Sequence, residues 1–189
     1  MKRCKDYRRL GWNAVSQYWI KAILFNLLAM IITSGLTSTV IGFFILGPFN
    51  VGMYLFYLRS VRREDASYGS LFEPIIKGDF LRTIILHLLK VVYTILWTML
   101  LFIPGIIKSY SYAMAEFIAI DNPNMSANDC ITASRQLMRG KKFKLFLLDL
   151  SFIGWIILCI IPFVSLFVMP YMNATRAAFY NDIKSELRK

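Results

Sequence analysis

Long apolar runs, separated by short segments that carry most of the charge, form the main pattern of this chain. The runs cover roughly residues 20–58, 83–120 and 145–175. Each has a turn signal near its middle: Thr33-Ser34-Gly35, Pro104-Gly105 and Pro162. Each run is too long for one crossing, because about 20 helical residues span the hydrocarbon core of a bilayer. The pattern predicts an all-α, polytopic transmembrane helical bundle of about six membrane segments, arranged as three hairpins.

A bundle of four membrane segments is the alternative. Residues 91–112 could form one segment across Pro104, and another hairpin could enter the membrane without crossing it. Several of the six segments would hold only about 15–17 residues, which predicts kinks or local thinning of the bilayer. We favour six segments because complete hairpins leave every basic segment on the same side of the membrane.

Positive charge is concentrated at both ends of the chain and between the apolar runs. Residues 1–21 contain six Lys or Arg and one acid, and residues 121–144 contain five Lys or Arg and two acids. Short loops rich in Lys and Arg stay in the cytoplasm. Both termini and both connecting segments are therefore predicted to be cytoplasmic, with the three turns outside.

Composition narrows the class of protein further. Of the 189 residues, 57% are hydrophobic and 17% are charged, which excludes an ordinary soluble domain and a disordered chain. Cys4, Cys130 and Cys159 form an odd set without metal-ligand spacing, so a disulfide scaffold is excluded. The net charge is +11, but the basic residues lie between membrane segments. The expected partners are therefore anionic lipid headgroups on the cytoplasmic side, and not nucleic acid.

Short amphipathic helices are expected in the cytoplasmic segments, one before each hairpin. Residues 7–18 have apolar positions at helical spacing. Ser70 and Glu73 have the spacing of a capping box, and Gly78 is expected to end that short helix. These helices are predicted to lie in the headgroup region of the inner leaflet.

The third amphipathic segment covers residues 126–139. Ser126 and Asp129 form another capping box, and Gly140 ends the helix. Its apolar stripe consists of Ala127, Cys130, Ile131, Ser134, Leu137 and Met138. Four basic residues here are predicted to contact lipid headgroups: Arg135, Arg139, Lys141 and Lys142.

An internal repeat is suggested by shifts of 61 and then 62 residues, within a single membrane domain of residues 1–189. The units would be residues 1–60, 61–121 and 122–182, related by an axis along the membrane normal. The shifts align Asn26 with His87 and Asp149, and they align Asn50 with Ser111 and Asn173. These six side chains are predicted to form an intramembrane polar layer, in which His87 and Asp149 could share a proton.

Charged residues within the apolar runs are the remaining candidates for a functional site, because a charge in hydrocarbon is costly. They are Lys90, Lys108, Glu116 and Arg176, together with Asp149. The structural alternative is that Lys90 or Arg176 pairs with Glu116 or Asp149, and that Lys108 reaches the outer surface.

Catalytic motifs are not expected in this chain. It has one His, and it contains no His-Glu-x-x-His, Gly-x-Ser-x-Gly or phosphate-binding glycine loop. We therefore predict no catalytic residues, no metal site, no cofactor and no enzymatic activity.

Four stretches of the chain have a distinctive sequence: Ile103-Pro-Gly-Ile-Ile-Lys108, Asp121-Asn-Pro123, Ser134-Arg-Gln-Leu-Met138 and Ala177-Ala-Phe-Tyr180. These stretches resemble the bacterial integral membrane family called domain of unknown function 975. The chain departs from the family pattern at Ile160-Ile-Pro162, where a glycine-rich turn is usual. The resemblance implies a multi-pass protein of the bacterial plasma membrane and brings no assigned activity.

Three function classes follow from these observations. The first is a non-enzymatic membrane module with a scaffold, regulatory or protective role in the bacterial envelope, which would have a membrane protein partner. The alternative is a small transporter or channel that uses the polar layer. An intramembrane enzyme is the weakest of the three, because no nucleophile and base lie at matched depth.

Overall fold

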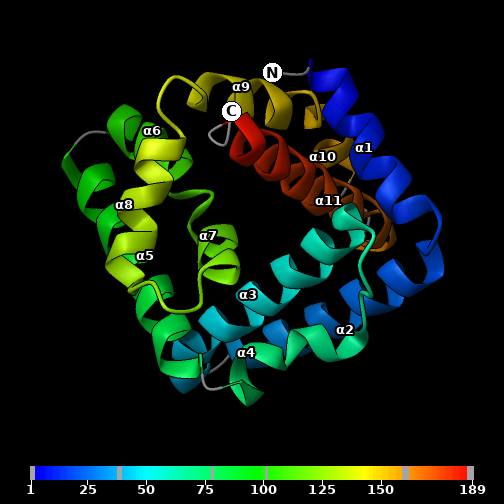
Figure 1. Cartoon of the computed structure of the whole chain (residues 1–189), viewed down its shortest axis with the longest axis horizontal. Coiled ribbons are helices and arrows are strands. Elements are labelled where there is room, and N and C mark those ends of the chain that lie inside the picture. The colour runs from blue at the N-terminus through cyan, green and yellow to red at the C-terminus, as the bar shows by residue number, and fades with distance from the viewer. Residues whose placement is uncertain (1–2, 38–39, 78, 101, 159–161, 187–189) are drawn as a thin grey trace.

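Helices make up most of the computed structural model, which describes residues 3–37, 40–77, 79–100, 102–158 and 162–186 (Figure 1). The described ranges contain no strand, so the expected all-α class is confirmed. The α-helices are α1 (Cys4–Ser16), α2 (Trp19–Thr37), α3 (Val40–Arg62), α4 (Glu73–Ile76), α5 (Phe80–Leu100), α6 (Phe102–Tyr112), α7 (Ala115–Asp121), α8 (Ala127–Leu137), α9 (Lys142–Leu150), α10 (Ile153–Leu158) and α11 (Pro162–Glu186). A 3₁₀ helix, η1 (Tyr68–Leu71), precedes α4. Cys159 and Gly78 lie outside the described residues.

Each apolar run folds as neighbouring helical segments. Helices α2 and α3 lie side by side, as do α5 and α6, and α10 contacts α11. The predicted turn at residues 33–35 is wrong, because α2 continues to Thr37. The hydroxyls of Thr33 and Ser34 donate to the carbonyls of Ala29 and Ile31, so these polar residues are satisfied within the helix. Pro104 lies in the first turn of α6 and Pro162 begins α11, positions where a proline without an N–H is tolerated.

In two arms of these hairpins the helix is interrupted, in line with the kinks expected of short segments. Ser151 and Phe152 separate α9 from α10. Ala113 and Met114 separate α6 from α7, and the backbone N–H of Met114 donates to the hydroxyl of Ser134 over 3.3 Å. By length and hydropathy, two described segments could cross a membrane, Trp19–Leu36 and Phe80–Leu100. The structure therefore agrees with the predicted six-segment bundle in its all-α class and in the pairing of its helices, but it does not confirm six membrane segments.

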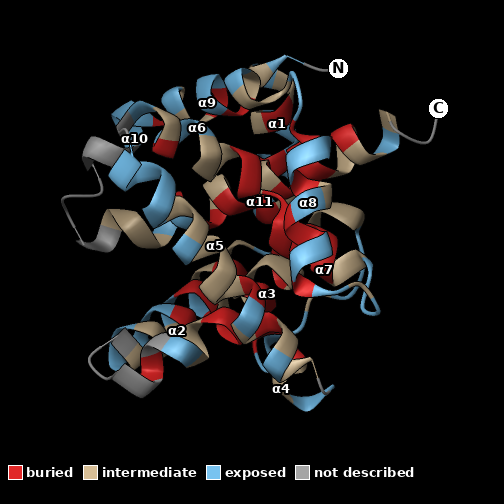
Figure 2. Ribbon diagram, turned by 90° about the vertical axis from the view of Figure 1, so that its left-hand side faces the viewer, coloured by how far each residue is buried: buried red, intermediate tan, exposed pale blue. Residues whose placement is uncertain are grey.

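The second arm of each hairpin is its C-terminal half, which is α3 in the first hairpin, α6 with α7 in the second and α11 in the third. These second arms converge near the middle of the molecule. Figure 1 shows α3, α7 and α11 around the centre, with α2, α5 and α9 further out. Aromatic rings join the inner helices: the centroids of Tyr54 and Phe117 are 4.8 Å apart, and those of Phe117 and Tyr180 are 5.2 Å apart. Buried residues are concentrated on these inner helices (Figure 2). The second arms therefore lie at the centre of the core, and α1, α2, α8 and α9 add buried residues around them.

Each short amphipathic helix covers a second arm. A Cβ on Gly52 of α3 would lie 2.4 Å from the carbonyl oxygen of Leu71, and one on Gly11 of α1 would lie 2.3 Å from Oγ1 of Thr175 in α11. The hydroxyl of Ser134 in α8 donates to the carbonyl of Ser111 in α6 over 2.8 Å. Thus η1 and α8 each cover the hairpin that precedes them, and α1 covers the last one. Each of the three hairpins is thus covered by one short helix.

The apolar stripe predicted for residues 126–139 is buried as a stripe, but its predicted environment is wrong. All six stripe residues are buried, and α8 contacts α5, α6 and α7. The apolar face of α8 therefore packs on protein instead of entering the headgroup region. The helical period identifies which face is apolar, but it carries no information about what covers that face.

Candidate functional site

Two ion pairs join four helices in the interior. The ammonium of Lys90 on α5 donates to Oε1 of Glu116 on α7. The guanidinium of Arg176 on α11 donates to both oxygens of Asp149 on α9, over 2.9 and 3.2 Å. Both carboxylates are largely removed from solvent. The expected pairing of Lys90 and Arg176 with these two acids is confirmed.

Two tyrosines lie beside the ion pairs, and one of them, Tyr54, is close to both pairs. Tyr54 on α3 interacts electrostatically with both Lys90 and Arg176. Tyr110 on α6 lies beside Asp149. Because these groups come from different helices, they hold the hairpins together and would be costly to leave partly unsatisfied in a low dielectric.

The predicted polar layer is only partly brought together. Asp149 forms its ion pair with Arg176. The carboxylate that interacts electrostatically with His87 is that of Glu116. The proposed sharing of a proton between His87 and Asp149 stays a prediction. A Cβ built on Gly47 would lie 2.9 Å from the Cβ of His87, so this histidine lies where α5 meets α3.

The other members of the layer lie in separate helix contacts. Asn26 is buried on α2, and Asn50 is half-buried on α3. The amide of buried Asn173 donates to Sδ of Met53 over 3.9 Å. The hydroxyl of Ser111 donates to the carbonyl of Ile107 within α6, and only the backbone carbonyl of Ser111 accepts a hydrogen bond from α8. The equivalence of these positions as a repeat stays a prediction.

A second polar cluster, centred on Asp121, was missed by the sequence reasoning. Arg62 donates two hydrogen bonds to Asp121, over 2.7 and 2.8 Å, and the hydroxyl of Tyr180 donates a third over 2.8 Å. Lys184 completes the cluster with an ion pair of 2.5 Å. Burial alone would raise the pKa of Asp121, but hydrogen bonds from Arg62, Lys184 and Tyr180 outweigh it and lower the pKa to about 2. The sequence did contain one signal for this cluster, because Asp121-Asn-Pro123 places an acidic residue at the end of an apolar run.

Basic residues from three helices surround a pocket on the outside of α6 and α8. The pocket has a volume of about 300 Å³ and is lined by Lys108, Arg135, Arg139 and Lys142, with Ser111, Thr132 and Gln136. A second hollow of about 180 Å³ shares Lys108 and Arg135. We call the hollow of about 300 Å³, with the four cations that line it, the basic pocket. The ammonium of Lys108 also lies 4.1 Å from the ring centroid of Trp97.

Two predicted positions are corrected by this arrangement. Lys108 faces Arg135 and Lys142 and not the outer turn, because α6 has only 11 residues and α8 lies against it. Lys141 does not join the other three predicted headgroup residues. Its ammonium pairs with Glu186 over 3.1 Å instead.

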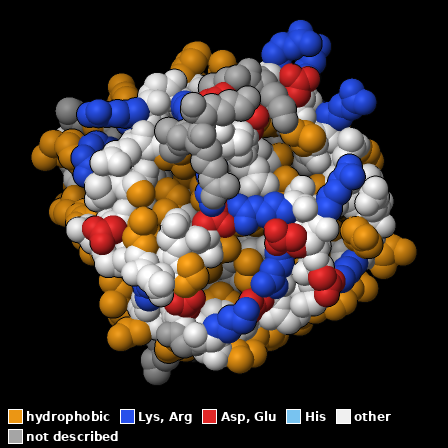
Figure 3. Space-filling view, viewed as in Figure 1, with side chains coloured by type: hydrophobic (Ala, Val, Ile, Leu, Met, Phe, Trp, Pro, Cys, Tyr) orange, Lys and Arg blue, Asp and Glu red, His pale blue; other side chains and the backbone are white. Residues whose placement is uncertain are grey.

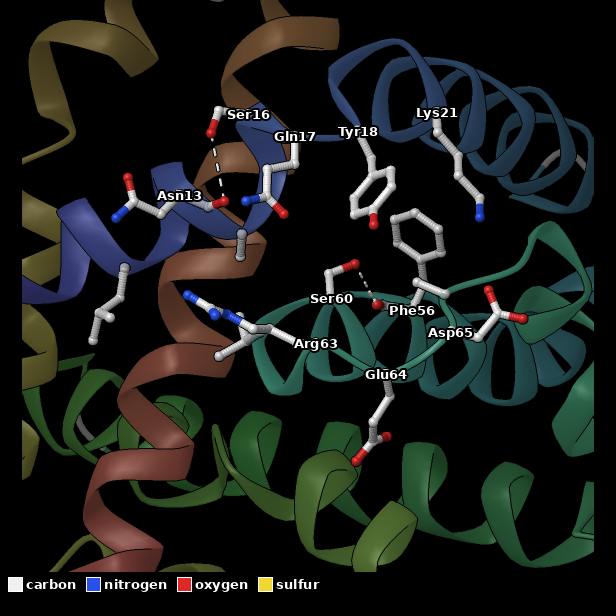
Figure 4. A pocket seen from close by; sticks show the side chains of 14 residues that line it. Asn13, Ser16, Gln17, Tyr18, Lys21, Phe56, Ser60, Arg63, Glu64 and Asp65 are labelled. Carbon is white, nitrogen blue, oxygen red and sulfur yellow. Dashed lines mark hydrogen bonds between the residues drawn. The ribbon is translucent and has the colours of Figure 1, made fainter.

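A cavity of about 650 Å³ lies between α1, the start of α2 and the end of α3. Figure 4 shows Tyr18 and Phe56 pointing toward one another across it. Its charged lining residues are of both signs: Lys21, Arg63, Glu64 and Asp65. This cavity therefore has no preference for an ion of either sign. Charges of both signs are also mixed over this face of the molecule, while hydrophobic side chains gather at its edge (Figure 3).

Comparison with known proteins gave one match. Residues 98–187 match the family model described as "Protein of unknown function (DUF975)". No match was found among curated proteins or among solved structures. The matched segment contains the basic pocket, Asp121 and three of the four residues of the interior ion pairs.

Proposed function

We propose that this chain, whose match over residues 98–187 supports membership of the domain of unknown function 975 family, is a non-enzymatic integral membrane module. It crosses the bacterial plasma membrane as three hairpins, with both termini in the cytoplasm. Its role is that of a scaffold, regulator or protector of other envelope components. The observation that carries the proposal is the pairing of Lys90 with Glu116 and of Arg176 with Asp149.

Membrane location is supported by the exposure of the most apolar helices. Only 22% of the window Trp19–Leu36 and 11% of Phe80–Leu100 are buried. A core helix of a soluble protein would be mostly buried, and soluble monomers rarely expose large continuous apolar patches. Exposed residues of α5 and α6 include Ile95, Leu96, Met99, Leu100 and Ile103. Lipid is the environment in which such a surface is stable.

A structural role for the interior charges is supported by their partners. Glu116 and Asp149 are each held by a cation, and a carboxylate in an ion pair is a poor general base and a poor ion ligand. Charged groups within membrane segments commonly pair with one another in this way. The two ion pairs then fix the arrangement of α5, α7, α9 and α11, so that the cytoplasmic face is presented as a rigid surface.

A small transporter or channel is the second candidate. One observation favours it: Oε2 of Glu116 is buried and has no hydrogen-bond partner within the described ranges. An unsatisfied carboxylate oxygen inside a protein is a position that a proton or a cation could occupy.

Reconstitution into liposomes separates the two candidates. The purified chain is tested for proton and small-cation flux against empty liposomes, and in parallel it is isolated from native membranes with its bound proteins and lipids. We expect no flux above empty liposomes and a partner that stays bound when Glu116→Gln is introduced. Flux that Glu116→Gln abolishes would replace the scaffold proposal by the transporter.

A further inference from the structure

We propose that the basic pocket binds the phosphate group of an anionic membrane lipid from the cytoplasmic leaflet. This inference rests on the proposed membrane location. Lys108 comes from α6, Arg135 from α8, Arg139 from the segment after α8, and Lys142 from the start of α9. Residues that are 34 positions apart in the chain thus meet around one hollow of about 300 Å³, which is a size that accommodates a headgroup.

Among the residues that the structure describes, the four cations lack an anionic counterpart. In the described part of the chain, no carboxylate lies within 4.0 Å of the charged groups of Lys108, Arg135, Arg139 or Lys142. The neighbouring Lys141 does have one, in Glu186. Like charges held together repel one another, and a bound anion removes that cost. The pocket is therefore electrostatically incomplete without an anion.

The donors present in the pocket suit phosphate. An arginine guanidinium presents parallel N–H donors that match two oxygens of a phosphate, and a lysine ammonium adds a point charge. Arg135 and Arg139 supply two such groups one turn apart, and Thr132 and Gln136 add neutral donors on the same side of α8. A monoanionic phosphodiester or a phosphomonoester would both be recognised by this set.

The surroundings of the pocket point to a lipid as the source of the phosphate. Ile103, Ile107 and Phe143 are exposed apolar residues on the same two helices as Lys108 and Lys142. They can contact acyl chains while the cations contact the headgroup. Trp97, over which Lys108 lies, is a residue type that is enriched at the level of the headgroups. A free phosphate ion would make no use of these apolar neighbours.

The test uses the full chain, purified in detergent and titrated with phosphatidylglycerol or phosphatidylcholine, with bound lipid counted by native mass spectrometry. The variant is the triple substitution Arg135→Gln, Arg139→Gln and Lys142→Gln. The matched control removes three other exposed charges: Lys5→Gln, Arg9→Gln and Arg63→Gln. We expect the first triple to weaken phosphatidylglycerol binding by at least about tenfold, because each cation near an anionic lipid contributes roughly 1 kcal/mol. The control variant should lose much less of its phosphatidylglycerol binding. Phosphatidylcholine binding should not change in either triple variant.

Further measurements keep the result unambiguous. If the triple variant does not fold, Lys108→Gln is tested alone, and high salt is applied to the wild type, where it should reduce the preference for phosphatidylglycerol. Inorganic phosphate and glycerol phosphate are added as soluble competitors. Competition by either as strong as that by the lipid would overturn the lipid assignment, and equal losses in both triple variants would overturn the pocket. Release of the wild type from native membranes by alkaline carbonate would instead refute the proposed membrane location.

Discussion

Arg62 at the end of α3 donates two hydrogen bonds, of 2.7 and 2.8 Å, to the carboxylate of Asp121 at the end of α7. Tyr180 and Lys184 of α11 bind the same carboxylate. One acidic side chain, only 7% exposed, thereby joins the second arms of all three hairpins. Side chains that are held at such a junction fix the relative positions of helices that the chain connects only through long intervening segments.

Replacing Asp121 by Asn should destabilise the protein at neutral pH by about 3–5 kcal/mol, because Arg62 and Lys184 lose their partner in a buried site. The folded pKa of Asp121 is lowered to about 2, so its stabilisation is complete above the ordinary value of 3.8 and is lost as the pH falls through 2. The difference in melting temperature between wild type and variant, measured in detergent, should therefore shrink between pH 4 and pH 2. Asp65→Asn, at an exposed carboxylate, is the control. A difference that is constant over this pH range would contradict the assignment.

Asp149 and Arg176 should behave as one unit in a double-mutant cycle. Asp149→Asn leaves the half-buried guanidinium of Arg176 without its carboxylate, and Arg176→Gln leaves the carboxylate of Asp149 without its cation. Each single variant should lower the free energy of unfolding, and the double variant should be more stable than the sum predicts by about 0.5–3 kcal/mol. Urea unfolding in mild detergent gives the three values. Additive effects would show that the ion pair does not contribute to folding.

Gly11→Ala should weaken the docking of α1, whereas Gly35→Ala should not weaken the fold. A methyl group on Gly11 would lie 2.7 Å from the backbone nitrogen of Thr175, while nothing lies within 4 Å of that position on Gly35. Overpacking at Gly11 should cost about 1–3 kcal/mol, and alanine in the helix at Gly35 should be neutral or stabilising by up to about 1 kcal/mol. Thermal unfolding and proteolysis of the N-terminal segment report both effects. Equal stability of the two variants would mean that α1 is not held against α11.

Cysteine labelling from outside the cell should reach positions near Gly35 and should spare Arg63 and Arg139. The background for this experiment is a chain with Cys4 and Cys159 replaced by Ser. Cys130 can stay, since burial raises the pKa of its thiol and keeps it from reacting. Labelling at Arg139 from outside would contradict the proposed cytoplasmic position of α8 and of the basic pocket.

Helical periodicity and the lengths of apolar runs determined the secondary structure and the helix pairs. The stripe from Ala127 to Met138 was readable because a helix places residues three and four apart on one face. The broken arms followed from segments that are short for a bilayer. These features depend on neighbouring residues, so local rules are sufficient to predict them.

Only the tertiary structure decided which groups meet. Asp149 had several chemically equivalent partners in the sequence, and it pairs with Arg176, 27 residues away. Lys108 was expected near the outer turn and lies beside Arg135, and Asp121 binds Arg62 across 59 residues. Charge attraction does not distinguish one arginine from another. The choice is made by the packing of whole helices, through close contacts such as that of Gly11 with Thr175, and this packing depends on the shapes of surfaces that are distant in the chain.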